Sequence, residues 1–409
     1  QCESTLKLVE QLREEHFDVL INENFDFCGI GLSHALGVKA TIITTSCSIF
    51  DNVAYDLGIP VVPSYNPNFY TMSLDVHSLW SRAVNTLKTH LTIPVFDTSK
   101  HCIDALMTRT YGADYPSISQ QTAAATFVFT NSEPLIDMAR PLLRKVVDLG
   151  GIGRRPPQPL DKNWQRIVSL RNQTVLLSFG SFSKSVSMEE ERKRAWLRVI
   201  RKFPNVTFVW KYEEPDDDFA TSQVANVANV VLSKWTPQND LLGSGRVTAF
   251  ISHGGLNSCL EAAANGVPGI FIPLFGDQPR NAMMMEEAGI GIAFAKSDVM
   301  NEWRLSHAVR RLLTSEDLAA TARRTAAMLA GRPFSQREQL VRHVEFAAEF
   351  GAAPALHPRG VHLSWIEYFL VDVIAATIVA VSAVSALALY AAIAVYRAVK
   401  RRSEMKKNE

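Results

Sequence analysis

The sequence predicts an α/β protein with two segments of parallel-sheet character and one membrane-spanning helix near its C-terminus. In both segments, short apolar runs typical of buried strands alternate with helix-like stretches; the first opens at Val19–Asn22 and the second at Thr174–Phe179. Such alternation favours a parallel sheet covered on both faces. The third observation is the uncharged apolar run Ile374–Val395.

Composition excludes some classes of function. The 409 residues hold 42 Lys and Arg against 41 Asp and Glu, for a net charge of +1, which argues against a nucleic-acid partner. The 5 cysteines show no C-x-x-C spacing, so we expect neither a metal site nor a dense disulfide framework. The sequence opens at Gln1 without Met, and a strand pattern follows at Phe17–Asn22. We interpret it as a truncated or processed chain that begins inside a fold.

The order of strand and helix patterns, with the glycines and prolines between them, predicts the domains of the chain. In the first segment, Cys28–Leu36 and Leu74–Leu91 have helical patterns, and Ala40–Thr44 has a strand pattern. Glycines and prolines of the 142–158 stretch mark a boundary. The predicted parts are a partial N-terminal domain at 1–160, a second domain at 161–350, a linker at 351–366, a transmembrane helix at 367–396 and a basic tail at 397–409.

The apolar run near the C-terminus is long enough to cross a bilayer, which takes roughly 20 residues. A buried core helix is the alternative, but aromatic residues such as Trp365 precede the run and a basic tail follows it. By the positive-inside rule the tail is cytosolic and the soluble part lies on the other side. Lys406 and Lys407 resemble a dilysine retrieval signal, although a generic basic tail is the alternative. We therefore expect a single-pass type I protein of the endoplasmic reticulum membrane with a lumenal soluble part.

Ligands of open parallel sheets bind at the carboxyl ends of the strands, and one such end here is rich in polar residues. A strand ends at Ser252, His253 and two glycines form the turn, and Asn257 or Ser258 can cap the following helix. Gly255 lets a ligand approach the backbone, and the helix N-terminus offers free N–H groups. This arrangement indicates a diphosphate site.

Other polar residues surround that turn in the predicted fold. Asp277 and Gln278 follow the next strand, and a carboxylate beside an amide suits the paired hydroxyls of a sugar. Trp235 could stack on a nucleobase. Ser181 stands in a further strand-to-glycine turn.

Each of these residues has an ordinary structural explanation when taken alone. His253 could be a hydrogen-bonded turn residue, Trp235 core packing, and Asp277 a turn former. Glu261, on the first turns of the helix, could belong to a solvated helix face. Their occurrence together, in this order along the chain, favours a functional site over these separate explanations.

The ordered set resembles a known signature. Trp235–Gln238, His253–Glu261 and Pro273–Gln278 together resemble the nucleotide-sugar signature of the UDP-glycosyltransferase family, and WTPQNDLLG resembles its UDP-glucuronosyltransferase branch. The resemblance implies a GT-B architecture of two Rossmann-like domains, with the first one incomplete here. The N-terminal domain would bind the acceptor and the C-terminal domain the donor.

The resemblance also implies a role for each residue of the signature. Trp235 would stack on uracil with Gln238 near the uridine, Glu261 would hold the ribose hydroxyls, His253, Gly255, Asn257, Ser258 and Ser181 would meet the diphosphate, and Asp277 and Gln278 would hold the transferred sugar. The UDP-sugar is a co-substrate, so no cofactor and no metal are expected.

The implied reaction is an inverting transfer of a hexosyl group, glucuronosyl or glucosyl, to a hydroxyl of a small lipophilic acceptor. A histidine acts as general base in the family, upstream of the part seen here; His16 and His34 do not stand in its motif. Glu23 aligns with the carboxylate that orients this base, where much of the family has Asp. Asp26 is the fallback, and a strand-end surface residue is the alternative for Glu23.

The sequence does not identify the donor sugar or the acceptor. UDP-glucuronate and UDP-glucose are not separable from the sequence, and Arg280 is only a positional guess for a cation beside a glucuronate carboxylate. The aromatic stretch Phe69–Met72 suggests lipophilic acceptors. The expected partners are the UDP-sugar, the acceptor, the lipid bilayer and family members in homo- or hetero-oligomers. A second hypothesis is a non-catalytic UDP-sugar binder that associates with intact family members.

Overall fold

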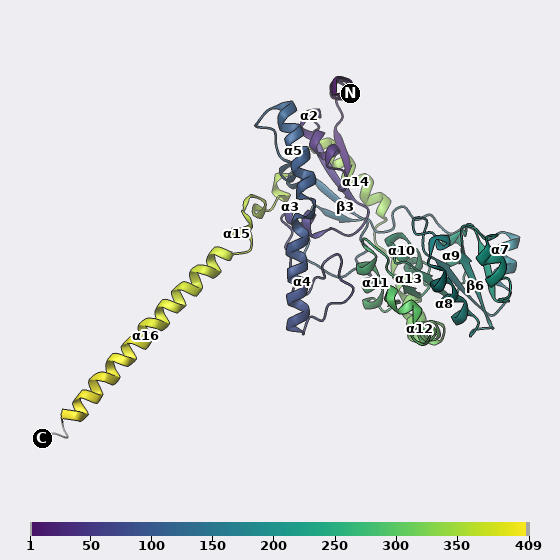
Figure 1. Cartoon of the computed structure of the whole chain (residues 1–409). Helices are drawn as coiled ribbons and strands as arrows, with labels where there is room; N and C mark the ends of the chain where they lie inside the picture. Colours follow the sequence, from purple (N-terminus) through teal and green to yellow (C-terminus); the bar gives the residue numbers. More distant parts are fainter. Residues whose placement is uncertain (1, 406–409) are drawn as a thin grey trace. The chain divides into compact units, whose positions relative to one another are not determined.

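The computed structural model describes residues 2–405, and the side chains from Lys7 to Ser403. Residue contacts divide the chain into two compact units, and the boundary in the sequence follows His357. The first unit contains two parallel sheets, each with its own helices, and we call these parts the first and second lobes (Figure 1). The two parallel α/β sheets and the long apolar C-terminal helix confirm the predicted fold class.

The first lobe is built on a four-stranded sheet in the order β1-β2-β3-β4. Its strands are β1 (Val19–Glu23), β2 (Ala40–Thr45), β3 (Phe127–Thr130) and β4 (Val146–Asp148). Every pairing is parallel, and Glu23 at the end of β1 lies opposite Thr44. The carboxyl ends of the strands therefore meet at one edge of the sheet.

Helices cover the first sheet and connect its strands. They are α1 (Cys2–Glu14), α2 (Phe27–Leu36), α3 (Asp51–Asp56), α4 (Leu79–Thr92), η1 (Ile93–Phe96), α5 (Asp97–Tyr111) and α6 (Ile118–Ala123). The predicted start of α4 at Leu74 is wrong, because the Ser78 side chain accepts the Ser81 N–H and begins the helix there. The loop before α4 packs through Asn85, whose amide donates to the carbonyls of Pro63 and Asn66.

The second lobe is built on a six-stranded sheet in the order β10-β9-β8-β5-β6-β7. Its strands are β5 (Gln173–Ser178), β6 (Val206–Lys211), β7 (Val230–Ser233), β8 (Ala249–Ser252), β9 (Gly269–Phe271) and β10 (Gly291–Ala293). Its helical segments are α7 (Lys162–Val168), η2 (Ser185–Ser187), α8 (Glu190–Ile200), η3 (Ala220–Val224), α9 (Gln238–Gly243), α10 (Leu256–Ala264), α11 (Gln278–Glu287), η4 (Lys296–Met300), α12 (Glu302–Thr314) and α13 (Glu316–Ala330). The strand order changes direction between β5 and β8, and a ligand crevice is expected at such a point.

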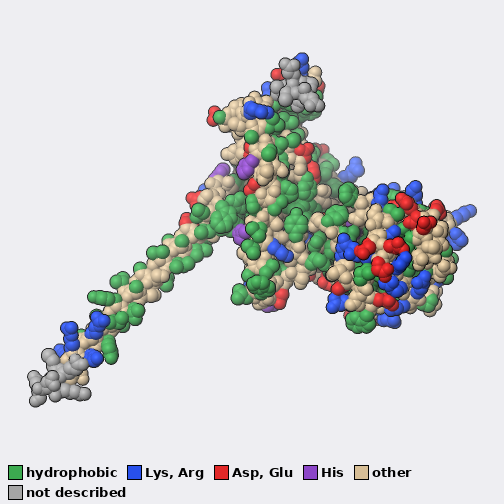
Figure 2. All heavy atoms as spheres, in the orientation of Figure 1, with side chains coloured by type: hydrophobic (Ala, Val, Ile, Leu, Met, Phe, Trp, Pro, Cys, Tyr) green, Lys and Arg blue, Asp and Glu red, His purple; other side chains and the backbone are tan. Residues whose placement is uncertain are grey.

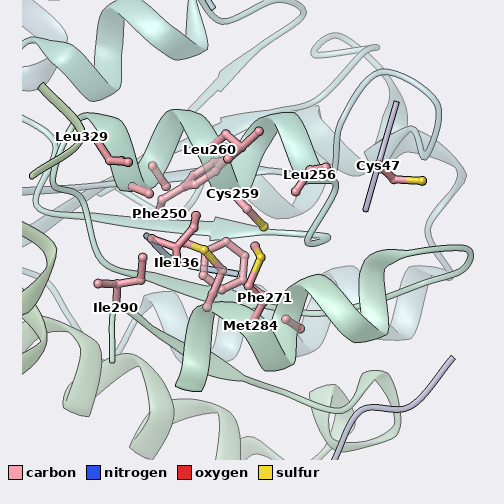
Figure 3. Packing of buried hydrophobic residues seen from close by; sticks show 14 of the residues in the cluster. Cys47, Ile136, Phe250, Leu256, Cys259, Leu260, Phe271, Met284, Ile290 and Leu329 are labelled. Carbon is pink, nitrogen blue, oxygen red and sulfur yellow. The ribbon is translucent and has the colours of Figure 1, made fainter. Parts of the chain in front are cut away.

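Two apolar cores lie on opposite faces of the second sheet. One contains the buried residues of α8 and α12. The other contains residues of α10 and α11, and Figure 3 shows Cys259 and Leu260 of α10 beside Phe271 of β9 and Met284 of α11. This second core also includes Ile136 of the first lobe, so the lobes share one apolar cluster.

The chain returns to the first lobe before the second unit begins. Helix α14 (Gln336–Phe350) contacts β1, β2 and β3, and its Ala347 packs in a cluster with Phe129. The short η5 (Pro354–Leu356) follows. The boundaries predicted for the domains stay a prediction.

The second unit contains η6 (Arg359–His362), α15 (Trp365–Tyr368) and α16 (Val371–Met405). Helix α16 is long and apolar enough between Val371 and Ser403 to cross a membrane. Figure 2 shows hydrophobic side chains along it and Lys and Arg side chains near its C-terminal end. The predicted retrieval signal at Lys406 and Lys407 lies outside the described residues.

Candidate functional site

The site lies at the carboxyl edge of the second sheet, where β5 and β8 end side by side. Ser178 is in register with Ser252, so the turns that follow, at Gly180 and His253, are neighbours. A Cβ on Gly180 would lie 2.7 Å from Cε1 of His253, and one on Gly255 would lie 2.6 Å from Nε2. Both glycines are therefore needed to seat the imidazole, and Gly180 also has a positive φ of 89°.

His253 is electrically neutral in this setting. Burial lowers the pKa of its imidazole to about 4, and the charge of Lys211 adds to this decrease. The Oγ atom of Ser252 lies 3.3 Å from Nδ1. At neutral pH the ring can therefore donate or accept a hydrogen bond but carries no charge.

Lys211 is a site residue that the sequence reasoning missed. It ends β6, and its Nζ donates to the Gly180 carbonyl at 2.7 Å and pairs with Glu213 at 3.0 Å. The same Nζ lies 5.6 Å from the ring centroid of Trp235. A lysine that ends the apolar run Val206–Trp210 is the sequence signal that could have identified it.

Trp235 is not core packing, because its side chain is 67% exposed. An exposed indole at a ligand crevice is open to stacking on a flat partner. Ser181 is also exposed at the end of the neighbouring turn, beside Phe182.

Glu261 and Gln238 form a hydrogen-bonded pair between α9 and α10. The Nε2 atom of Gln238 donates to Glu261 Oε2 at 2.7 Å and to Ser258 Oγ at 3.1 Å. Burial raises the pKa of the Glu261 carboxyl above its ordinary value. Glu261 is half-buried, so it does not belong to a solvated helix face.

The predicted capping of α10 by Asn257 or Ser258 is wrong. The helix begins at Leu256, two or three residues earlier than that prediction required, with Gly255 as N-cap and no side-chain cap. Asn257 and Ser258 therefore lie within its first turn. Asn257 is exposed and accepts a hydrogen bond from Asn131 of the first lobe at 3.2 Å.

Asp277 and Gln278 organise the turn between β9 and α11. Asp277 Oδ2 accepts the amide of Asn281 at 2.7 Å, and burial raises the pKa of its carboxyl. The Oε1 atom of Gln278 accepts the backbone N–H groups of Leu274 and Phe275 at 2.7 and 3.1 Å. The amide Nε2 of Gln278 is therefore the side-chain group left to contact a ligand.

Glu23 faces the same region from the first lobe. Its carboxylate accepts Thr44 Oγ1 at 3.1 Å and Ser46 Oγ at 3.3 Å. Burial raises the pKa of the Cys47 thiol to about 12, and the carboxylates of Asp277 and Glu23 add to this increase. Cys47 is thus within electrostatic range of one carboxylate from each lobe. The alternative Asp26 is engaged as the N-cap of α2, where it accepts the N–H of Cys28.

Arg280 joins the two lobes instead of facing the crevice. Its Nη2 pairs with Asp137 Oδ1 at 2.6 Å, its Nη1 donates to Ser48 Oγ at 3.0 Å, and it is 3% exposed. Asp137 also accepts hydrogen bonds from Ser48 and Ser132. Burial alone would raise the pKa of Asp137, but Arg280 and these hydroxyls hold it below its ordinary value. The guanidinium is therefore committed to Asp137.

The chain is similar over most of its length to known glycosyltransferases. The family model described as UDP-glucoronosyl and UDP-glucosyl transferase matches residues 2–407. The chain is 28% identical over 369 residues to UDP-glucuronosyltransferase 3A1 of Bos taurus, covering 90% of this chain and 69% of that protein. It is 28% identical over 393 residues to UDP-glucuronosyltransferase 3A2 of Homo sapiens, covering 91% of this chain and 71% of that protein.

A solved structure shares the fold. The crystal structure of the "Glycotransferase of kitacinnamycin" superimposes with a TM-score of 0.57 at 17% identity, covering 82% of this chain and 80% of that one. Similarity at this level of identity concerns the fold alone. It establishes the GT-B arrangement of two parallel-sheet lobes that the sequence predicted.

Proposed function

Because the chain belongs to the UDP-glucuronosyl and UDP-glucosyl transferase family, we propose that it binds a UDP-sugar at the carboxyl edge of the second sheet and transfers the sugar. The observation that carries this proposal is the pairing of Gln238 with Glu261 beside the exposed indole of Trp235. Gly180 and His253 follow the two strands between which the strand order reverses, the usual position of a nucleotide in such folds, and Glu261 lies on the helix that begins there.

The nucleotide is assigned to four groups of the second lobe. Trp235 stacks on the uracil, and Glu261 accepts the ribose hydroxyls. The N-terminal amides of α10, with Ser258, meet the diphosphate. His253 donates a hydrogen bond to this anion. Because the pKa of its imidazole is low, the ring is uncharged before UDP binds.

The sugar is assigned to the turn that precedes α11. The Asp277 carboxylate and Nε2 of Gln278 bind hydroxyls of a hexose, either glucuronosyl or glucosyl. Arg280 is paired with Asp137, so a glucuronate carboxylate would have to find a different cation.

The reaction is an inverting displacement that needs no metal. An acceptor hydroxyl attacks the anomeric carbon, and UDP leaves with its charge stabilised by the α10 amides. Glu23 orients the histidine base of the family reaction, a role assigned to neither His16 nor His34, and stabilises its protonated form, as carboxylates do in other His–carboxylate pairs. Its hydrogen bonds to Thr44 and Ser46 hold the carboxylate at the edge of the first sheet.

The acceptor is a small lipophilic alcohol or phenol. Aromatic side chains gather near Glu23, with Phe25 and Phe50 at a ring-centroid distance of 5.0 Å and Phe50 and Phe69 at 3.7 Å. The exposed Phe25 and the half-buried Phe96 form the accessible apolar surface of this cluster over the buried rings of Phe50 and Phe69. Such a surface favours a ring or hydrocarbon over a polar acceptor.

Helix α16 anchors the protein in the endoplasmic reticulum membrane, with the lobes in the lumen. The basic residues Arg397, Lys400 and Arg401 near its end support a cytosolic position for that end by the positive-inside rule. Acceptors that partition into the bilayer would then reach the enzyme from the membrane.

The test uses the full-length protein, including any segment N-terminal to Gln1, in detergent micelles. UDP binding is measured by calorimetry, and transfer to a phenol is assayed with a panel of UDP-sugars. Asp277→Asn should bind UDP as the parent does but lose transfer, whereas Asp216→Asn, at an exposed turn, should keep both. UDP binding without turnover for any sugar would favour the non-catalytic binder, and absence of UDP binding would reject the proposal.

A further inference from the structure

A cavity of about 290 Å³ lies in the second lobe on the face opposite to the proposed nucleotide site. Its walls come from α8, the 182–189 segment, the turn after β9 and η4. Phe179, Trp196 and Val299, which line it, belong to the apolar core beneath α8 and α12. The nucleotide site uses α10, which packs into the core on the other face of the sheet. The cavity is therefore a separate feature.

Two N–H donors at this cavity have no acceptor within the described structure. The side chain of Trp196 is 0% exposed, and its Nε1 has no hydrogen-bond partner. The other orphan donor is the buried Nε of Arg192. By contrast, the indole of the equally buried Trp210 donates to Ser185 Oγ at 3.1 Å. Since buried donors are normally satisfied, the two orphans indicate an acceptor that the chain itself does not supply.

Both donors belong to side chains on the same face of α8. Arg192 and Trp196 are four positions apart on α8, so their side chains are neighbours. Two adjacent N–H groups can each meet one oxygen of a carboxylate.

Charge at the cavity also favours an anion. Lys184 and Lys296 line it with Arg192, and Glu189 is the single carboxylate among the lining residues. Glu189 lies 3.5 Å from Nη2 of Arg192, which leaves Nε of that side chain unpaired. The remaining walls are mainly apolar and include Ile272.

We propose that this cavity binds an amphipathic carboxylate. Its two oxygens accept the N–H groups of Trp196 and Arg192, and its charge is balanced by Lys184 and Lys296. Its hydrocarbon portion packs against the apolar walls around Ile272.

The cavity shares two segments with the proposed donor site, but none of the residues assigned to the nucleotide or the sugar lines it. Phe179 comes directly before the Gly180 turn, and the N–H of Leu274 donates to Gln278. The carboxylate and UDP should therefore bind at the same time rather than compete.

The experiment measures binding to the full chain in detergent by ligand-observed NMR and calorimetry. The probes are 4-phenylbutyrate, octanoate and the uncharged 4-phenylbutanol, with and without saturating UDP. The two acids distinguish an acidic aromatic ligand from a fatty acid. We expect a carboxylate to bind at least about tenfold more tightly than the alcohol, since a charge-assisted hydrogen bond is lost in the alcohol.

Two variants probe the two kinds of contact. Trp196→Phe removes the N–H and keeps an aromatic ring, and its matched control is Trp303→Phe at an exposed position. The double variant Lys184→Gln, Lys296→Gln removes exposed charges without touching the core, and its control is Lys162→Gln on α7. Both cavity variants should weaken carboxylate binding about tenfold or more, with the controls unchanged.

The proposal is overturned if neither acid binds, if the alcohol binds equally well, or if UDP displaces the acid. Unchanged binding in the lysine double variant would also overturn it, and this variant is the safeguard should Trp196→Phe fail to fold. A crystal structure with the acid present that shows only water between Trp196 and Arg192 would overturn it as well.

Discussion

The carboxyl edges of the two sheets are built differently. At the edge of the second sheet, short hydrogen bonds hold the polar side chains in place: Gln238 to Glu261 at 2.7 Å and Leu274 to Gln278 at 2.7 Å. At the edge of the first sheet, Glu23 accepts longer bonds, of 3.1 Å from Thr44 and 3.3 Å from Ser46. The second edge is pre-organised for a polar ligand, whereas the first offers one carboxylate beside aromatic rings.

The first edge takes part of its order from the other lobe. Asp137 is held by Arg280, and Asn131 donates to Asn257, so side chains of the second lobe complete the polar contacts of the first. The difference suggests that nucleotide binding is a property of the second lobe alone, while the first lobe depends on both. The following variants test this division.

The largest effect is expected on stability, for Arg280→Met. This change leaves the buried carboxylate of Asp137 without its partner, which should lower the free energy of unfolding by about 3–5 kcal/mol. Urea denaturation of the purified chain measures it. Arg304→Met, whose exposed ion pair with Asp298 makes it the control, should cost at most about 1 kcal/mol.

A second variant checks the cause. Adding Asp137→Asn to Arg280→Met removes the unpaired charge and should recover part of the loss. If the double variant were no more stable than Arg280→Met, the unpaired carboxylate would not be the reason.

The next effect is on UDP affinity, for Glu261→Gln. Losing the charged acceptor of the ribose hydroxyls should weaken binding by about 1.5–3 kcal/mol, measured by calorimetry. Glu302→Gln, at an exposed ion pair of α12, serves as control. Equal affinity in Glu261→Gln and the parent would contradict the ribose assignment.

The same residue gives UDP binding a pH dependence. Burial raises the pKa of Glu261 above the ordinary glutamate value, and only the ionised form accepts both hydroxyls. UDP affinity should therefore hold at neutral pH and fall as the pH drops through this raised pKa. A calorimetric pH series on the parent and on Glu261→Gln tests it, because the variant should lack this step.

A somewhat smaller loss is expected for Trp235→Ala. Removing a base–aromatic stack costs about 1–3 kcal/mol, and Trp235→Phe should restore part of it. The control is Trp303→Ala, which removes a similarly exposed indole on α12. If Trp235→Ala bound UDP as tightly as the parent, the uracil would have to lie elsewhere.

The same contrast explains what the sequence could and could not predict. The signature residues of the second edge stand in three short stretches, 235–238, 253–261 and 273–278, and each stretch begins one or two residues after a strand ends, so a local pattern identifies them. Arg280 and Asp137 are 143 positions apart, and nothing local to either residue predicts their contact. The predicted start of α10 was wrong because the helix follows Gly255, an N-cap residue that has no capping side chain to recognise in the sequence. Alternation of strands and helices is also local, which is why the fold class was predictable.

The smallest effect on UDP affinity is expected for Glu23→Gln, and this variant tests the division most directly. Glu23 belongs to β1, and its side chain accepts hydrogen bonds from Thr44 and Ser46 of the same lobe, so UDP affinity should stay within about twofold of the parent. Transfer should fall, because a neutral amide stabilises a protonated histidine less than a carboxylate does. Calorimetry and the transfer assay on one preparation separate the two quantities. A large loss of UDP affinity would mean that the first lobe shapes the nucleotide site, and the two edges would then act as one.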